Sequence, residues 1–255
     1  MKPVLSLENV SYSYHNLKSE TPALSEISFQ VKEGEFLAIA GPSGCGKSTL
    51  LSIIAGLLKP EKGTLSFGSS CRIGYMLQHD HLFEWRTIYQ NVILGLELNK
   101  TVTKENTDYV LQLLKDYGLY SFRDKKPSEL SGGMRQRAAL IRTMATKPDL
   151  LLLDEPFSAL DFQTRLTVSA DIGNIIRSTG KTAILITHDL SEAITLADRV
   201  LVLSKRPAMV KYELPIHFEI DRTSPLAIRA TPVYQTYFNL LWKELSDDLS
   251  DNEIN

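Results

Sequence analysis

The sequence has few cysteines, little net charge and no long hydrophobic run. Two cysteines among 255 residues are too few for a disulfide framework, which favours a reducing compartment. No apolar run approaches the roughly 18 residues that a membrane-spanning helix requires, and the first residues lack a signal-peptide core. The formal net charge of −2 gives no basic surface for nucleic acid. We therefore expect a chain that neither crosses a membrane nor binds nucleic acid.

What remains is an ordinary globular composition, 43% hydrophobic and 23% charged. It suffices for one large α/β domain with a buried core. Continuous apolar runs are typical of parallel strands that are covered on both faces, and such runs occupy residues 36–40, 150–153, 183–187 and 199–203. Strand-like segments of a different kind predict a small antiparallel subdomain, at residues 4–10, 28–31 and 64–67.

Helical patterns dominate residues 86–135 and the end of the chain. Thr103 can cap a helix that stops at Gly118. The pair Thr231-Pro232 predicts the start of a last helix. The acidic residues 246–255 then predict a frayed tail.

A glycine-rich motif follows the strand predicted at residues 36–40. It fits the phosphate-binding pattern G-x-x-x-x-G-K-[ST], with the residues Gly41, Pro42, Ser43, Gly44, Cys45, Gly46, Lys47 and Ser48. The glycines let successive backbone N–H groups curl around an anion. Lys47 supplies a charge for the β- and γ-phosphates, and the Ser48 hydroxyl can ligate Mg²⁺. Because Thr49 opens a predicted helix whose positive end faces the phosphates, we expect residues 41–49 to bind ATP.

A second group of motifs lies in the later half of the chain. The segment Leu-Ser-Gly-Gly-Met-Arg-Gln-Arg at 130–137 precedes an apolar strand that ends at Asp154, and Glu155 follows. With these motifs the sequence resembles the ATP-binding subunit of an ABC transporter, over roughly residues 4–245. The other residues that match the family are Tyr14, Gln78, Asp161 and His188.

The resemblance implies a fold and a reaction. The fold is α/β: a RecA-like P-loop NTPase core with an antiparallel β subdomain and an inserted α-helical subdomain at about 86–135. The ATP-binding domain then spans residues 4–245, and 246–255 form the acidic tail. The reaction is ATP hydrolysis coupled to transport, with ATP and Mg²⁺ as cofactors.

Two acidic residues can carry the hydrolytic chemistry. A carboxylate at the end of an apolar strand needs a cation, so we expect Asp154 to bind Mg²⁺ opposite Ser48. Glu155 can polarise the attacking water as a general base. By resemblance, His188 contacts the γ-phosphate, and Gln78 reaches both Mg²⁺ and the attacking water.

The adenine is expected to stack on an aromatic side chain near the N-terminus. The family aromatic corresponds to Tyr14. Since alternation places Tyr12 and Tyr14 on one face of a strand, either ring can serve, and the match favours Tyr14.

The motif at residues 130–137 is expected to act in trans. By resemblance it opens a helix pointed at the ATP of a second subunit, which implies a head-to-tail homodimer with two ATP molecules. The trans contacts would come from Ser131, Gly132, Gly133 and Gln136, with Asp161 at the same interface. Met134, Arg135 and Arg137 fit either an interface or a plain charged helix face.

Residues 78–98 look like those of the nitrate, sulfonate, taurine and bicarbonate importer group. Glu84 and His79 depart from that group, where a proline and an acidic residue are common. The resemblance implies transmembrane permease subunits, a solute-binding protein outside the membrane, and a peripheral location on the cytoplasmic face of the cell membrane. The solute would be a small anion, or alternatively a thiamine-precursor pyrimidine. Trp85 is either a core residue or part of the groove that receives a permease helix.

Other classes of nucleotide-binding protein fit less well. A soluble ABC ATPase for DNA repair or translation would carry long inserts or two cassettes. A GTPase would need the aspartate of an N-K-x-D motif, which residues 99–102 lack. A silent regulatory module would not need both Glu155 and His188.

Overall fold

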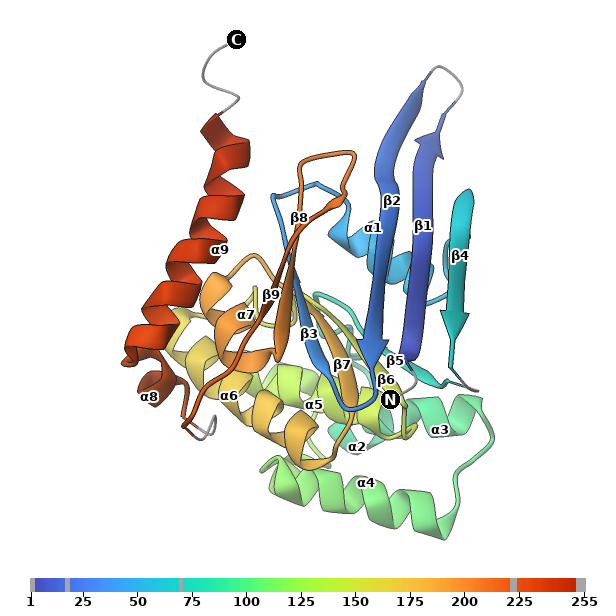
Figure 1. The fold of residues 1–255 in the computed structure, drawn as a ribbon. Coiled ribbons are helices and arrows are strands. Elements are labelled where there is room, and N and C mark those ends of the chain that lie inside the picture. The colour runs from blue at the N-terminus through green and yellow to red at the C-terminus, as the bar shows by residue number, and fades with distance from the viewer. Residues whose placement is uncertain (1–2, 17–18, 69–70, 221–223, 251–255) are drawn as a thin grey trace. The chain divides into compact units, whose positions relative to one another are not determined.

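The computed structural model describes residues 3–16, 19–68, 71–220 and 224–250 (Figure 1). The chain divides into two compact units. The first unit comprises residues 1–71 and 173–255, and the second unit comprises residues 72–172. The phosphate-loop motif therefore belongs to the first unit, and the motif at 130–137 belongs to the second.

The first unit begins with a three-stranded antiparallel sheet. Its strands are β1 (Pro3–His15), β2 (Glu20–Lys32) and β4 (Lys62–Phe67), in the order β2-β1-β4. In β2 the residues Ile27, Phe29 and Val31 are buried, and the residues between them are exposed. This alternation gives the sheet one apolar face. The predicted antiparallel subdomain is confirmed, with longer strands than expected.

A second sheet of the first unit carries the phosphate loop. Its strands are β3 (Phe36–Ala40), β7 (Thr182–Ile186), β8 (Arg199–Leu203) and β9 (Val210–Pro215), in the order β7-β3-β8-β9. β3 is parallel to both of its neighbours, and β9 is antiparallel to β8. Every residue of β3 and β7 is buried, as their continuous apolar sequences predict.

Four helices lie wholly within the first unit's described residues: α1 (Lys47–Ile54), α7 (Leu190–Leu196), α8 (Pro225–Arg229) and α9 (Pro232–Ser250). The Thr231 hydroxyl accepts a hydrogen bond from the Tyr234 N–H, as the predicted cap requires. Helix α9 continues to Ser250, so the acidic segment expected from residue 246 begins as helix. Residues 251–255 of that segment lie outside the described residues.

The second unit contains two parallel strands and all of residues 86–135, which the sequence predicts to be mainly helical. The strands are β5 (Ile73–Met76) and β6 (Leu150–Asp154). The helical elements are α2 (Ile88–Val92), α3 (Leu94–Leu98), α4 (Lys104–Asp116), η1 (Tyr120–Phe122), η2 (Pro127–Glu129) and α5 (Gly132–Met144). α5 packs against α2, α4 and β5. Helix α6 (Phe162–Ser178) starts in the second unit and ends in the first.

The ends of helix α4 are those that the sequence predicts. The Thr103 hydroxyl accepts a hydrogen bond from the Asn106 N–H at 3.2 Å. Gly118 lies just past the helix with a φ of 71°, which a residue with a side chain rarely adopts. The buried face of the helix is formed by Val110, Leu113 and Leu114.

Trp85 does not belong to the core. Its side chain is 73% exposed, and its ring stacks on Phe83 with 4.7 Å between the ring centroids. The core alternative for this residue was therefore wrong, because the segment before α2 turns the aromatic pair outward.

Candidate functional site

The phosphate loop joins the buried end of β3 to the start of α1. Gly46 has a φ of 128°, and a Cβ there would lie 2.9 Å from the Ala23 carbonyl oxygen, so only glycine fits. The Lys47 ammonium group donates hydrogen bonds to the carbonyl oxygens of Gly41, at 2.8 Å, and Pro42, at 2.9 Å. No side chain caps the N-terminus of α1. The loop thus holds a buried cation beside a helix terminus, and both favour an anion.

His188 faces the same loop. A cavity of about 650 Å³ is lined by Gly41, Pro42, Ser43, Gly44, Cys45, His188, Lys205, Arg206, Trp242 and Leu245. His188 follows β7, and Asp189 caps α7 by accepting hydrogen bonds from the N–H groups of Ser191 and Glu192. The histidine is thereby fixed between a buried strand and a capped helix. The sequence predicted that His188 lies at the phosphates. It did not predict the other lining residues outside the loop, which are Lys205, Arg206, Trp242 and Leu245.

Tyr14 reaches the helix that follows the phosphate loop. Its hydroxyl lies 3.0 Å from the Thr49 hydroxyl, and its ring makes an edge contact with Tyr12. Tyr14 is 41% exposed, whereas Tyr12 is only partly exposed. Tyr14 is thus the more exposed of the two tyrosines and is bonded to α1. Its stacking on adenine stays a prediction.

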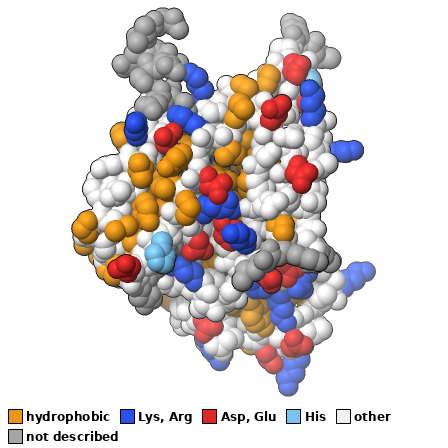
Figure 2. All heavy atoms as spheres, viewed as in Figure 1, with side chains coloured by type: hydrophobic (Ala, Val, Ile, Leu, Met, Phe, Trp, Pro, Cys, Tyr) orange, Lys and Arg blue, Asp and Glu red, His pale blue; other side chains and the backbone are white. Residues whose placement is uncertain are grey.

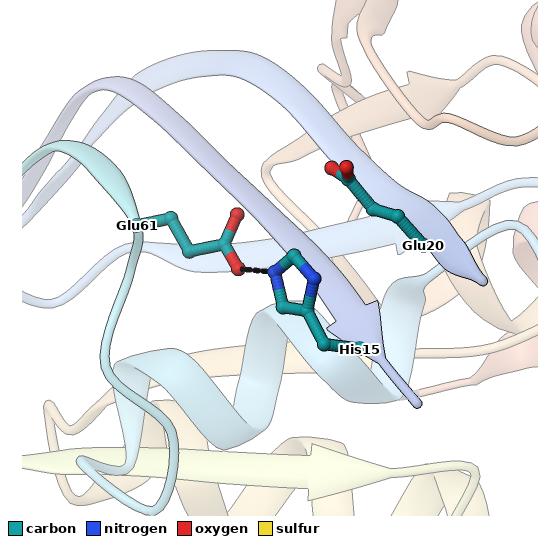
Figure 3. Close-up of side chains that lie close together, drawn as sticks. All are labelled: His15, Glu20 and Glu61. Atoms are coloured by element: carbon teal, nitrogen blue, oxygen red, sulfur yellow. Dashed lines mark hydrogen bonds and ion pairs between the residues drawn. The ribbon is translucent and has the colours of Figure 1, made fainter. Parts of the chain in front are cut away.

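A small polar cluster ends strand β1 next to Tyr14. His15 Nε2 lies 2.6 Å from Glu61 Oε1, and Glu20 brings a third possible ligand atom within 4.8 Å of the others (Figure 3). Glu61 Oε2 also accepts a hydrogen bond from the Ser13 N–H. All three members are exposed, and a surface ion pair of this kind accounts for the arrangement without a cation.

The two carboxylates that the sequence assigns to hydrolysis, Asp154 and Glu155, lie at the end of β6 in the second unit. Asp154 is 8% exposed and accepts a hydrogen bond from the Tyr75 hydroxyl at 3.4 Å. Glu155 has a φ of 44°, a strained conformation for a residue with a long side chain. The Ser158 hydroxyl donates to the Glu155 carbonyl oxygen and accepts from the Gln78 amide. The structure therefore connects Gln78 to the turn that carries Glu155.

The motif at 130–137 opens helix α5. The Ser131 hydroxyl accepts a hydrogen bond from the Met134 N–H and caps the helix. A Cβ on Gly133 would lie 2.9 Å from the Thr164 methyl group, so the glycine allows α5 to approach α6 closely. A cavity of about 400 Å³ is lined by Ser131, Gly133, Met134, Arg137, Asp161, Gln163, Thr164, Thr167 and Val168. Of the predicted signature residues, Ser131 and Gly133 thus meet Asp161 at this cavity.

Asp161 is oriented by the start of α6. Its carboxylate accepts hydrogen bonds from the N–H groups of Gln163 and Thr164, each at 3.1 Å. Hydrogen bonds from the Thr164 side chain and backbone lower the pKa of Asp161 below its ordinary value. The group is therefore held as a charged cap at the edge of this cavity.

Gln136 lies apart from the cavity. Its side chain is only 3% exposed, and its Oε1 has no hydrogen-bond partner among the described residues. Gly132 opens the first turn of α5, where a Cβ would meet Leu160. Contacts of Gln136 and Gly132 with ATP stay predictions.

Two arginines of α5 hold the loop that follows Gln78. Arg135 Nε donates to Asp80 at 2.9 Å, and its other end pairs with Glu84 at 3.2 Å. Arg142 donates to the carbonyl oxygens of Asp80 and His81. Burial of Asp80 opposes its ionisation, but hydrogen bonds from Arg135 and the Leu82 N–H outweigh it and lower the pKa. From the sequence, Arg135 could belong either to a dimer interface or to a plain charged helix face. Within the chain, its side chain holds the segment after Gln78 through Asp80 and Glu84. Arg137 pairs with Asp171 at 2.6 Å.

Comparison with known proteins agrees with these motifs. The family described as "ABC transporter" matches residues 24–158. An uncharacterized ABC transporter ATP-binding protein of Bacillus subtilis, YtlC, is 45% identical over 95% of each chain. This chain belongs to the ABC transporter family. It is an ATP-hydrolysing cassette of that family, and the relatives group it with the ATPase subunits of importers.

Further ABC relatives cover most of the chain. The taurine import ATP-binding protein TauB of Ruegeria pomeroyi is 41% identical over 83% of this chain and 82% of its own. Among solved structures, a dimeric post-hydrolysis state of the cassette MJ0796 bound to ADP and Pi matches with a TM-score of 0.72. That match has 31% identity and covers 84% of this chain and 99% of the other. The cassette cbiO1 of Clostridium perfringens, part of the complex cbiONQ, matches with a TM-score of 0.75 and 28% identity, over 94% and 96%.

The α/β fold predicted for a P-loop cassette is confirmed by these structural neighbours. Among the residues that the structure describes, no helix is long and apolar enough to cross a membrane.

Proposed function

We propose that this chain is the ATPase subunit of an importer for a small organic anion of the taurine or sulfonate type. The observation that carries the ATPase role is the cavity in which His188 faces the phosphate loop. Residues 41–45 of the phosphate loop and His188 line this cavity. The loop leads directly into the buried Lys47 and the N-terminus of α1, and this combination suits the phosphates of ATP. The TauB relatives, whose names state taurine import, support the solute class.

We assign different parts of the hydrolysis reaction to the phosphate loop and to the residues at the ends of β5 and β6. Lys47 stabilises charge that develops on the phosphates. Ser48, Gln78 and Asp154 offer hydroxyl, amide and carboxylate oxygens, the donor types that Mg²⁺ prefers, and we assign them to hold it. When bound, Mg²⁺ neutralises part of the phosphate charge. Tyr14 stacks on the adenine.

Glu155 and His188 serve the attacking water. Glu155 takes a proton from the water as general base, and His188 holds the γ-phosphate. The link from Gln78 through Ser158 to the Glu155 carbonyl oxygen supports a shared role for these residues. The positive φ of Glu155 is the kind of local strain that is kept at functional sites.

The cavity at the start of α5 serves a second copy of the chain. Ser131, Gly133 and Asp161 line it, and we propose that they contact the ATP held by the partner. Homodimerisation with two ATP molecules then couples nucleotide state to the permease, because ATP has a γ-phosphate for these contacts and ADP has none. The dimeric MJ0796 cassette bound to ADP and Pi supports this arrangement.

Light scattering after size exclusion tests the ATP-driven dimer. The Glu155→Gln variant keeps the shape of the residue and slows hydrolysis, so saturating MgATP should convert it to a dimer, whereas MgADP should leave it monomeric. Lys47→Ala should stay monomeric with either nucleotide. A Glu155→Gln protein that has bound ATP by equilibrium dialysis and is still monomeric would contradict the proposal.

The solute and the partners need a separate measurement. We expect transmembrane permease subunits, with an extracytoplasmic solute-binding protein joined through them, at the cytoplasmic face of the membrane. Vesicles holding the permease that co-purifies with this chain should take up taurine when ATP is present. Uptake of a thiamine-precursor pyrimidine instead would support the alternative solute, and co-purification of nucleic acid without any membrane protein would favour a non-transport ATPase.

A further inference from the structure

The C-terminal helix α9 contributes to the cavity that holds the phosphate loop. Trp242 and Leu245 of α9 line this cavity together with residues 41–45 and His188. None of the motifs that mark the nucleotide site includes these two residues. The wall of the nucleotide cavity is therefore formed in part by a segment near the end of the described chain.

Helix α9 is fixed along its length. The Tyr234 hydroxyl donates to the Ser191 hydroxyl at 2.9 Å, and Leu241 is fully buried. The Lys211 ammonium group donates to the Glu244 carbonyl oxygen. Since the residues on both sides of Trp242 are held, the position of the indole beside the loop follows from packing rather than from a mobile end.

One of these anchors leads back to His188. Ser191 lies in the first turn of α7, and Asp189, which follows His188 directly, accepts a hydrogen bond from the Ser191 N–H at 2.7 Å. The Tyr234 hydroxyl is bonded to the side chain of the same serine. A shift of His188 on nucleotide binding would thus reach α9 through one short chain of hydrogen bonds.

The face of α9 around Trp242 is apolar and open. Hydrophobic side chains gather over the part of the first unit that carries α9 (Figure 2). Trp242 is 57% exposed and stacks on Phe238, with 6.2 Å between the ring centroids. An indole pairs a large apolar surface with one N–H donor. Lys205 and Arg206, which line the cavity with it, supply further donors and positive charge.

We propose that Trp242 is a positioning residue of the nucleotide site, and that ATP bound at the phosphate loop covers its indole. The proposal deepens the ATPase function proposed above and depends on it. The indole closes one side of the phosphate cavity and limits the access of water there, while the N–H group, Lys205 and Arg206 face the phosphates. Helix α9 thereby becomes an element that responds to the bound nucleotide.

Tryptophan fluorescence tests this inference, because the chain has only two tryptophans. In the Trp85→Phe background the remaining indole is Trp242. MgATP should change its emission and reduce its quenching by acrylamide, with the half-saturation that equilibrium dialysis gives for ATP. Adding Lys47→Ala should abolish the response.

Kinetics add a readout that separates positioning from folding. Trp242→Ala should raise KM for ATP about three- to tenfold with a nearly unchanged melting temperature, and Trp242→Phe should restore most of the affinity. Leu240→Ala is the matched control, because Leu240 is 40% exposed on the same helix and does not line the cavity.

Two outcomes would overturn the inference, and they differ. In the first, equilibrium dialysis shows that ATP binds, but MgATP changes neither the emission of Trp242 nor its quenching, and Trp242→Ala leaves KM unchanged. The proposed role of Trp242 is then wrong, and the ATPase function stands. If no nucleotide binds to the folded chain, the proposed function fails and the inference fails with it.

Discussion

At the scale of one residue, the backbone of Glu155, which we propose as the general base, is held in an unusual conformation. Its backbone has a φ of 44°, a region that costs a residue with a side chain on the order of 1 kcal/mol or more. The Ser158 hydroxyl is bonded to the carbonyl oxygen of Glu155 and to the Gln78 amide. These bonds hold the backbone of the turn that carries Glu155, and a fixed backbone suits the general base that we propose.

Glu155→Gln should keep ATP binding and lose most of the hydrolysis. The amide has the same shape but cannot take the proton of water, so phosphate release should fall by about 10²- to 10⁴-fold. Phosphate release and nucleotide binding by dialysis measure the two effects. Phosphate release within a fewfold of that of the unchanged chain would remove Glu155 from the mechanism.

At the scale of elements, helix α5 and the segment after Gln78 are joined by hydrogen bonds and an ion pair. Arg135 and Arg142 of α5 both bond to this segment, and Asp80 receives both arginines. The N-terminal end of the same helix carries Ser131 and Gly133. A change at either end of α5 can therefore be passed to Gln78 by a rigid helix rather than by a flexible chain.

The Asp80 carboxylate makes the stability of the fold depend on pH. Its pKa in the folded chain lies below the ordinary value of 3.8, so its ionised form stabilises the fold. That contribution is complete above the unfolded pKa and is lost as the pH falls through the folded pKa. Asp80→Asn should lower the free energy of unfolding by about 1–2 kcal/mol at pH 7, and the difference should shrink below about pH 4.

Urea unfolding at several pH values measures this difference. Asp108→Asn supplies the control, because Asp108 is an exposed residue of α4. An Asp80→Asn deficit that is equally large at pH 3 and pH 7 would show that the ion pair is not its cause.

Local signals in the sequence predict some elements well and others not at all. Thr103 and Gly118 bound α4, and continuous apolar runs identify β3 and β7, because caps and burial leave a trace in neighbouring residues. The phosphate loop is equally local. The arginine anchors at Asp80, and the cavity that Trp242 lines together with the phosphate loop, bring together residues that are distant in the sequence. No short window of sequence contains them, and the helical start of the acidic segment at 246 was missed because composition alone favoured a tail.

At the scale of the whole molecule, an ATPase cassette must pass its nucleotide state to a permease. Phe83 and Trp85 form an exposed stacked pair in the segment between Gln78 and α2. The arginine anchors hold the same segment. We infer that the permease docks on this pair, since exposed aromatic anchors suit such contacts.

Trp85→Ala should keep basal ATP hydrolysis and the melting temperature, because the side chain is 73% exposed. It should weaken capture of the permease and reduce transport. A pull-down of the permease, the melting temperature and basal phosphate release on this one variant separate docking from folding. Unchanged permease capture by the variant would rule out the docking role.

Steady-state phosphate release from the purified chain tests the central claim, that this cassette hydrolyses ATP at the phosphate loop. The account predicts release that requires Mg²⁺ and falls by at least about 10²-fold in Lys47→Ala, because the buried ammonium group stabilises the transferred phosphate. Lys59→Ala, at an exposed lysine outside the loop, should release phosphate at the unchanged rate. Release by Lys47→Ala equal to that of Lys59→Ala would contradict the claim.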